Sequence, residues 1–168
     1  AVASYLSSMG ELTLWNTTQN PHIARFVTSM VTGLGEHKIR VIAPEVGGGF
    51  GSKIPVYPWE MLAVFCSMKL GRPVKWINSR SESFASDTHG RDQVSTVRLA
   101  LDSDGTFRAL RTETIGNLGA FCGTVGPFTS TAGSARTQGG PYAFEAMYYR
   151  SRAVFTNTCP MDPYRGAG

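Results

Sequence analysis

Residues 47–53 read Gly-Gly-Gly-Phe-Gly-Ser-Lys and form the segment of this chain that is best suited to chemistry. Glycine has no Cβ, so a ligand can approach its peptide N–H groups closely and the chain can adopt positive φ. A run rich in β-branched residues precedes the segment, and a helix-like run follows it. Because the N-terminus of a helix also offers unpaired donors, the segment predicts a binding site for an anionic ligand.

Two common phosphate-binding patterns fit this segment poorly. In a P-loop the hydroxyl follows the lysine, whereas here Ser52 precedes Lys53 and Ile54 follows it. In a dinucleotide fingerprint Gly47 and Gly49 would supply the first pair, but Ser52 takes the third glycine position and no acid lies near residue 73. A nucleotide-binding oxidoreductase that uses the loop as a phosphate cradle is therefore the weaker alternative.

Phe50 distinguishes the loop at Gly47 to Gly51 from a turn that merely lets a helix and a strand pack closely. A large aromatic side chain between glycines has few local neighbours and stays partly bare unless something large packs on it. A flat cofactor or substrate would cover it. The loop is therefore interpreted as a ligand site, and a non-enzymatic glycine-rich interaction module remains an alternative.

The composition predicts a globular protein whose own side chains form no metal site. Hydrophobic residues make up 42% of the 168 residues and charged residues 17%, with a net charge of +4. The Lys and Arg residues are scattered, which argues against nucleic-acid binding. Cys66, Cys122 and Cys159 are too far apart for a zinc or iron–sulfur site, and the histidines are isolated, so a metal would arrive within a cofactor. Unpaired thiols favour a cytoplasmic location, and no apolar run is long enough to span a membrane.

The first half of the chain predicts alternating strands and helices. Strands are expected around residues 12–15 and at 39–42, where apolar and β-branched residues gather. Pro21 begins a helix whose apolar residues recur every three or four positions up to a pair of glycines. A second helix begins at Pro58 and is apolar nearly all round, which predicts a buried helix. A short strand is expected at 74–77.

The second half predicts a hairpin and one more strand. Residues 79–91 are polar and are predicted to be mostly turn. Residues 97–115 alternate in polarity on both sides of Asp-Ser-Asp-Gly, which predicts an antiparallel hairpin. Residues 116–140 contain too few apolar anchors to place, and a last strand is expected at about 147–156. This order of elements predicts an α+β fold with a mixed β-sheet and packed helices.

Residues 47–53 also resemble the glycine-rich cofactor segment of the molybdenum hydroxylases, the xanthine oxidase and aldehyde oxidase family, whose common form has Gly where Ser52 stands. Thr-Gln-Asn at 18–20 is similar to the family's upstream glutamine segment, and Pro-Tyr-Arg-Gly-Ala-Gly at 163–168 to its downstream arginine turn. Further matching segments extend the resemblance over nearly the whole chain: residues 71–76, 89–91 and 117–121. The resemblance implies that residues 1–168 are a fragment of the molybdenum cofactor-binding domain of a large subunit, truncated at both ends.

The resemblance also implies roles for residues at and near the loop. Gln19 resembles the side-chain amide that hydrogen-bonds a molybdenum oxygen, and the alternative is a polar cap for the following helix. Phe50 resembles the aromatic residue beside the oxo face of the metal. Backbone N–H groups at Gly48, Gly49 and Gly51 would meet the pterin or a phosphate.

Arg165 and Gly166 resemble the family's downstream cofactor contacts. The main chain of Arg165 would lie at the metal and its side chain would orient substrate, and the alternative for that side chain is an ion pair. Gln19, Phe50 and Arg165 would lie near molybdenum without being side-chain ligands. These three residues are therefore expected to converge on one cavity.

The implied reaction is hydroxylation of an aldehyde or N-heteroaromatic carbon with oxygen derived from water. The family's general base is a glutamate downstream of this chain, so no catalytic residue is assigned, and Glu45 and Glu60 are expected to be structural. Ile54 and Ala167 stand where purine-oxidising members carry glutamate and phenylalanine, and Gly166 stands where copper-containing carbon monoxide dehydrogenases carry cysteine. The remaining resemblance is to the carbon monoxide dehydrogenase-like group.

The implied cofactor is a molybdopterin-type molybdenum cofactor in its cytosine dinucleotide form. A [2Fe-2S] small subunit and an FAD-binding medium subunit are the implied partners that receive the electrons, alongside a small-molecule substrate. Because the resemblance implies that residues 1–168 lack the rest of the subunit, the isolated polypeptide is expected neither to retain cofactor nor to turn over substrate.

Overall fold

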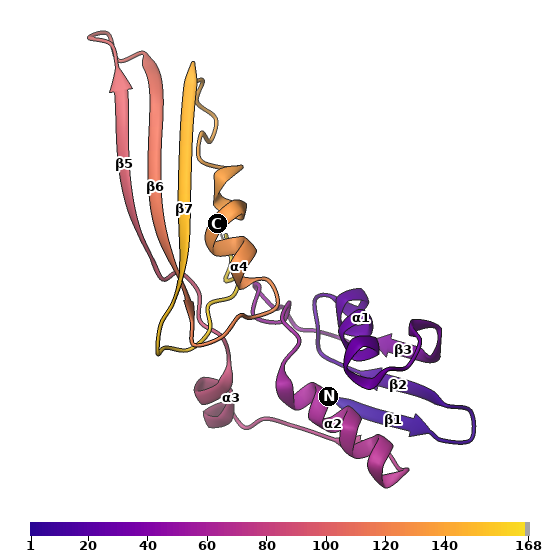
Figure 1. Ribbon diagram of the computed structural model, residues 1–168. Helices are drawn as coiled ribbons and strands as arrows, with labels where there is room; N and C mark the ends of the chain where they lie inside the picture. Colours follow the sequence, from indigo (N-terminus) through magenta and orange to yellow (C-terminus); the bar gives the residue numbers. More distant parts are fainter. Residues whose placement is uncertain (167–168) are drawn as a thin grey trace. The chain divides into compact units, whose positions relative to one another are not determined.

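The computed structural model describes residues 1–166, which form two compact units (Figure 1). The first unit spans Ala1–Asp87, and the second begins at Thr88. Each unit contains a mixed β-sheet and helical segments, so the predicted α+β class is confirmed, with two sheets in place of one. Among residues 1–166, no helix has both the length and the hydropathy that a membrane span requires.

The sheet of the first unit has the strand order β3-β2-β1-β4. Strand β2 (Glu11–Trp15) pairs antiparallel with β1 (Val2–Leu6) and parallel with β3 (Ile39–Ile42), and β1 pairs antiparallel with β4 (Val74–Lys75). The predicted strands at 12–15 and 39–42 are confirmed, and the last strand is shorter than expected. The sequence does not predict β1, because small residues interrupt the pattern of β-branched and aromatic side chains that marks a strand.

Both long helices of the first unit begin at a proline and end at a glycine. Helix α1 (Pro21–Thr32) ends at Gly33 and α2 (Pro58–Leu70) ends at Gly71, whose φ angles of 75° and 62° are left-handed. Proline has its φ preset for the first turn, and glycine adopts the left-handed cap without a Cβ clash. The predicted ends of both helices are confirmed. A short 3-10 turn, η1 (Glu36–Lys38), leads from α1 into β3.

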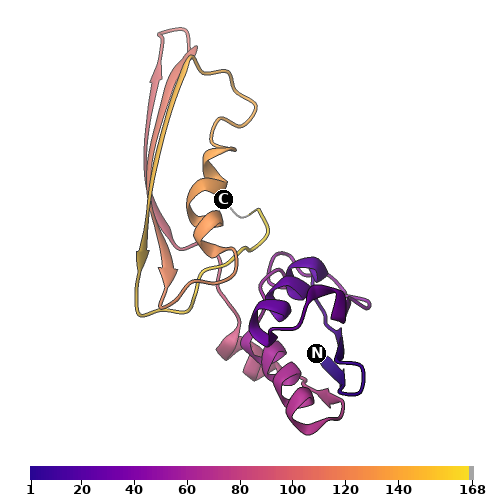
Figure 2. The same cartoon turned by 45° about the vertical axis from the view of Figure 1, so that its right-hand side comes forward.

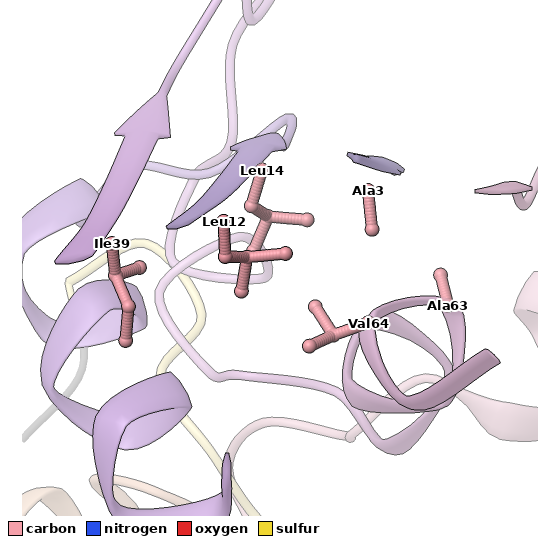
Figure 3. Packing of buried hydrophobic residues seen from close by; sticks show 6 residues of the cluster. All are labelled: Ala3, Leu12, Leu14, Ile39, Ala63 and Val64. Atoms are coloured by element: carbon pink, nitrogen blue, oxygen red, sulfur yellow. The ribbon is translucent and has the colours of Figure 1, made fainter. Parts of the chain in front are cut away.

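The core of the first unit lies between the sheet and the helices (Figure 3). Helix α2 contacts β1, and α1 contacts β3. The buried core residues are small or aliphatic, which lets the helices approach the sheet closely: Ala3, Leu12, Leu14, Ile39, Ala63 and Val64.

The prediction that α2 is a buried helix is wrong within this unit. Its Leu62 and Phe65 side chains are 47% and 60% exposed, while Ala63 and Val64 face the core. The apolar stripe of α1 is likewise open to solvent, as at Met30, which is 69% exposed. A helix that packs on one side of a single small sheet can bury only one of its faces. In α1 the buried residues are small and lie outside the apolar stripe.

Helix α3 (Arg80–Ser86) lies in the segment predicted to be mostly turn, so that prediction is wrong. Ser79 Oγ accepts a hydrogen bond from the N–H of Glu82 at 3.2 Å, and Glu82 Oε2 accepts one from the N–H of Ser79 at 2.7 Å. This reciprocal pair is a capping box. Its Ser-x-x-Glu spacing is visible in the sequence, but the helix has no apolar face to draw attention to it.

The second unit is built on a sheet of strand order β5-β6-β7. Strands β5 (Gln93–Leu101) and β6 (Phe107–Gly119) form the predicted antiparallel hairpin. The turn between them is closed by Gly105, which has a φ of 89° and donates its N–H to the carbonyl of Asp102 at 3.0 Å. Strand β7 (Ala146–Phe155) runs parallel to β6 and confirms the last predicted strand.

Residues 120–145 connect β6 to β7 and include two short helical turns, α4 (Gly126–Phe128) and η2 (Thr129–Gly133). Figure 2 shows this helical segment along one side of the sheet. Tyr149 of β7 holds it there, because its hydroxyl donates to the carbonyl of Thr131 at 3.0 Å. The segment therefore owes its conformation to contacts distant in sequence.

Candidate functional site

Gln19 is bound to the far end of the glycine loop. Its backbone N–H donates to the carbonyl of Lys53 at 2.9 Å. Its side-chain Oε1 accepts hydrogen bonds from the N–H groups of Gly51 at 2.9 Å and of Lys53 at 3.3 Å. The N-cap of α1 is Asn20, so capping is not what the Gln19 side chain does. The structure thus brings together residues that lie 32 and 34 positions apart in the sequence.

The loop conformation depends on glycine at several positions. Gly47, Gly48 and Gly51 have φ angles of 70°, 93° and 96°, in the left-handed region that L-residues avoid. Gly49 is required for a different reason, because a Cβ there would lie 2.1 Å from Gln19 Oε1. The glutamine side chain therefore occupies the space that a side chain at Gly49 would need.

Phe50 adopts a strained backbone conformation at the centre of the loop. Its φ of 53° is left-handed, and its side chain is 59% exposed. A residue with a Cβ in this region costs on the order of 1–3 kcal/mol and persists where the surroundings enforce it, often at a ligand site. A side chain at Gly48 would meet the Phe50 ring at 3.1 Å, so the ring lies over bare backbone.

The loop leaves some of its donors unused. The N–H of Ser52 donates to the carbonyl of Gly49 at 2.9 Å, and that of Gly51 is engaged by Gln19. The N–H groups of Gly48 and Gly49 have no acceptor within residues 1–166. Of the glycine donors predicted to meet a ligand, two are thus available and the one at Gly51 is already bonded.

Lys53 closes the loop on itself. Its Nζ donates to the carbonyl of Val46 at 2.6 Å. In a P-loop the lysine reaches the phosphates of the nucleotide, and this lysine is engaged by the main chain instead. The geometry therefore weakens the nucleotide-binding alternative further.

Glu60 supports the loop from beneath and has the structural role expected from the sequence. It is 5% exposed, and its Oε2 accepts the N–H of Tyr57 at 3.1 Å. Tyr57 in turn donates its hydroxyl to the carbonyl of Ser52 at 2.7 Å. Burial raises the pKa of the Glu60 carboxyl, and hydrogen bonds from Asn16 and Tyr57 oppose that rise. The contact through Tyr57 is not predictable from the sequence, since tyrosine is not a usual capping residue.

A pocket of about 320 Å³ lies beside this support within the first unit. Aromatic and polar side chains share its lining: Lys53, Tyr57, Trp59, Glu60, Trp76 and Asn78. The rings of Tyr57 and Trp59 stack with centroids 4.3 Å apart. The C-terminal end of the loop, at Lys53, therefore borders a pocket with largely aromatic walls.

Arg165 and Gly166 lie in the second unit, on an exposed turn. The carbonyl of Arg165 accepts a hydrogen bond from Arg91 Nη2, and Gly166 has a left-handed φ of 71°. Ala167 and Gly168, the end of the predicted arginine turn, lie outside the described residues. Gln19 and Phe50 belong to the first unit, so the convergence of all three residues on one cavity stays a prediction.

Comparison with known proteins gives a consistent family. A family model described as the molybdopterin cofactor-binding domain matches residues 1–168. The carbon monoxide dehydrogenase large chain of Afipia carboxidovorans is 41% identical over 156 residues, which cover 93% of this chain and 19% of that protein. The nicotine 6-hydroxylase large subunit of Paenarthrobacter nicotinovorans is 35% identical over 171 residues, which cover 99% of this chain and 21% of that protein.

Among solved structures, quinoline 2-oxidoreductase from Pseudomonas putida 86 matches with a TM-score of 0.91 and 39% identity. The match covers 99% of this chain and 21% of that one. The present chain therefore spans about a fifth of the length of the relatives it matches.

Proposed function

Because this chain belongs to the molybdopterin cofactor-binding domain family, we propose that it forms one wall of the cofactor site in the large subunit of a molybdenum-dependent oxidoreductase. The observation that carries the proposal is the junction of Gln19 with the glycine loop. There the amide of Gln19, unused N–H donors of the loop and the exposed ring of Phe50 lie around a backbone formed mainly by glycine.

These groups fit a flat, anionic, oxygen-rich cofactor. Oε1 of Gln19 is occupied by the N–H groups of Gly51 and Lys53, so the end of the amide left for a ligand is its NH₂ group. The N–H groups of Gly48 and Gly49 offer two further donors. All of these are donors, as recognition of oxo, thiolate or phosphate groups requires.

The chain's own residues would bind and orient the cofactor. When bound, the cofactor supplies a two-electron oxidation that uses oxygen derived from water. The Gln19 amide would donate a hydrogen bond to an oxygen of the cofactor, and the Phe50 ring would shield the cofactor from water. The main chain of Arg165 would face the cofactor, and the Arg165 side chain would orient the substrate. These assignments give the chain a positioning task and no catalytic base.

We assign the substrate to the aldehydes or N-heteroaromatic compounds. Two of the similar proteins are named for nicotine and quinoline, both of which contain a ring nitrogen. Ile54, next to the loop lysine, is apolar and cannot pair with a purine's polar edge. The cofactor would be the cytosine dinucleotide form, the electrons would pass to [2Fe-2S] and FAD subunits, and the location would be the cytoplasm.

In this proposal the general base lies outside this chain, as the family resemblance implies, and Glu60 is not available for that role because it is buried and accepts the N–H of Tyr57. Because residues 1–168 span only about a fifth of the length of the relatives, the isolated 168-residue chain should neither hold molybdenum stoichiometrically nor turn over substrate. The cofactor should require the complete polypeptide.

Gln19→Glu tests the proposal most directly. Glutamate can accept the same two N–H bonds, so the loop should keep its shape, but it has no amide donor and adds a negative charge. The complete polypeptide would be produced in cells that make the cofactor, and its molybdenum and acid-released nucleotide would be measured. We expect the variant to retain cofactor about tenfold less well, since hydrogen bonds to charged groups are worth about 1.5–3 kcal/mol.

Gln138→Glu is the matched control. Gln138 lies in the second unit, where its Oε1 accepts from the hydroxyl of Thr112 at 3.2 Å, a bond that glutamate can also accept. This control should hold molybdenum as the parent does. A parent protein that carries a nucleotide but no molybdenum would reject the proposal in favour of the nucleotide-binding alternative.

A further inference from the structure

The second unit aligns two segments that lie at its opposite ends in sequence. The N–H of His89 donates to the carbonyl of Pro160 at 3.0 Å, and the N–H of Asp162 donates to the carbonyl of His89 at 2.8 Å. His89 and Met161 thus form an isolated parallel bridge. The segment that leads into the arginine turn is held against residues 89–91 by main-chain bonds.

Beyond this bridge, side chains fasten the turn itself. Gly90 lies so close to Tyr164 that a Cβ at Gly90 would be 2.5 Å from the Cβ of Tyr164. The guanidinium Cζ of Arg91 lies 4.9 Å from the centroid of the Tyr164 ring. Nη2 of the same guanidinium donates to the carbonyl of Arg165. One side chain therefore contacts two successive residues of the turn.

We propose that Arg91 is a positioning residue that fixes the turn at residues 164–166 and so sets where the main chain of Arg165 points. The consequence for the cofactor rests on the proposed function, which puts that main chain at the molybdenum site. The fastening of the turn does not rest on it.

The backbone of Arg91 supports a positional role. Its φ of 61° is left-handed, which a residue with a Cβ adopts at a cost, and such strain is concentrated at functional sites. Glycine would adopt this conformation without strain. The presence of arginine therefore indicates that the side chain, and not the backbone conformation, is what this position requires. Arg91 makes no ion pair within residues 1–166, so the guanidinium is not there to neutralise a carboxylate.

The chemistry of arginine explains why no other side chain would serve. A guanidinium is planar, so it can stack on an aromatic face and donate in its own plane at the same time. An ammonium can donate to the carbonyl of Arg165, but it has no flat face for Tyr164. The arrangement also borders a pocket of about 240 Å³, lined in part by Arg91, Ser130, Tyr164 and Gly166, so a shift of the turn would reshape it.

Arg91→Gly isolates the guanidinium, because glycine suits the left-handed backbone and should leave the fold intact. In the complete polypeptide, hydrogen exchange over residues 160–166 should become about tenfold faster or more, which is the effect expected on losing a hydrogen bond from a charged donor. Added guanidinium ions should restore part of the protection. Arg91→Lys should give an intermediate rate, and Arg152→Ala, at an exposed arginine of β7 that makes no ion pair within residues 1–166, should have no effect.

Molybdenum content and turnover of an aldehyde or N-heteroaromatic substrate separate the two claims. Faster exchange with reduced molybdenum content or turnover, and rescue of both by guanidinium, supports the full proposal. Unchanged exchange in Arg91→Gly overturns it. Faster exchange with molybdenum content and turnover at parental levels overturns the link to the cofactor. A parent protein without molybdenum rejects the proposed function, while the exchange measurement still decides whether Arg91 fastens the turn.

Discussion

The two units use glycine for opposite purposes. In the first unit Gly47 and Gly48 give the loop positive φ and leave backbone donors uncovered. In the second unit a Cβ at Gly123 would lie 1.8 Å from the Asp162 carboxylate, and one at Gly126 would lie 1.9 Å from the carbonyl of Met161. The first pattern leaves the backbone of the loop uncovered, whereas the second lets two chain segments touch in a packed joint. Glycine therefore produces an open loop in one unit and a packed joint in the other.

The two buried carboxylates show the same contrast. Glu60 accepts the N–H of Tyr57 and, through Tyr57, supports the loop. Asp162 is 4% exposed, its Oδ1 accepts the N–H of Val125 at 3.2 Å, and its Oδ2 has no partner within the described residues. Burial raises the pKa of both groups. The carboxylate in the first unit caps its own helix, three residues from its partner. The carboxylate in the second unit bonds a segment that lies 37 positions away in the sequence.

Gly126→Ala should give the largest effect, because its Cβ would meet backbone that cannot move independently. We expect the second unit to lose about 3 kcal/mol of unfolding free energy, as overpacked sites do. All three tryptophans lie in the first unit, so the measurement should follow hydrogen exchange of β6 during denaturant titration of the 168-residue chain.

Two matched substitutions sharpen this result. A Cβ at Gly105 would meet no atom within 4 Å, so Gly105→Ala should cost only the left-handed strain of about 1 kcal/mol. Gly49→Ala would displace only the flexible end of Gln19, so it should weaken cofactor retention more than stability. Equal losses of stability in all three variants would remove the distinction between an open loop and a packed joint.

Glu60 should make the first unit less stable as pH rises from acid toward neutral. Its folded-state pKa is raised above the ordinary value of 4.5, so its stabilising contribution is complete below that value and is lost as pH rises through the folded-state pKa. Glu60→Gln cannot ionise and should flatten this dependence while keeping an acceptor for Tyr57. Glu60→Ala should cost about 1–3 kcal/mol, because it leaves the buried N–H of Tyr57 unsatisfied. Tryptophan fluorescence during urea titrations at several pH values measures both effects.

The opposite pH slope for the first unit would show that Glu60 is stabilised in its charged form. The prediction that its carboxylate only supports the loop would then be wrong. Asp87, the C-cap residue of α3, also has a pKa raised by burial, so the comparison needs Asp87→Asn as a control.

Local signals in the sequence predicted much of the first unit and little of the connections in the second. The ends of α1 and α2 follow from proline and glycine at fixed positions, and these act within one turn of the helix. The family resemblance implied that Gln19 and Phe50 approach one cavity, but it did not predict the hydrogen bonds between Gln19 and the loop. These bonds depend on the parallel pairing of β2 with β3, which no local pattern specifies. The faces that α1 and α2 bury depend on the sheet they meet.

In the second unit the hairpin was predictable because its turn is local, and residues 116–140 were not. Gly116 and Gly119 are buried because Ser130 and Cys159 approach them from far along the chain. Arg91 lies in a motif noted only for resemblance, and its contact with Arg165 spans 74 positions. Such residues carry no periodicity or capping signal, so only the structure identifies them.

Ser79→Ala should give the smallest effect and tests whether local signals act locally. The substitution removes the hydroxyl that accepts the N–H of Glu82 and should cost about 1 kcal/mol, as loss of an N-cap does. Because α3 has no buried residues, this loss should appear as faster exchange of the N–H groups of Ser83 and Asp87, with an unchanged global midpoint. Ser79→Asp keeps an acceptor and should restore protection. A fall in the unfolding midpoint of the first unit would mean that α3 unfolds cooperatively with the rest of that unit. Its capping box would then contribute to the stability of the whole unit, as the packing of Gly126 against Met161 is expected to do in the second.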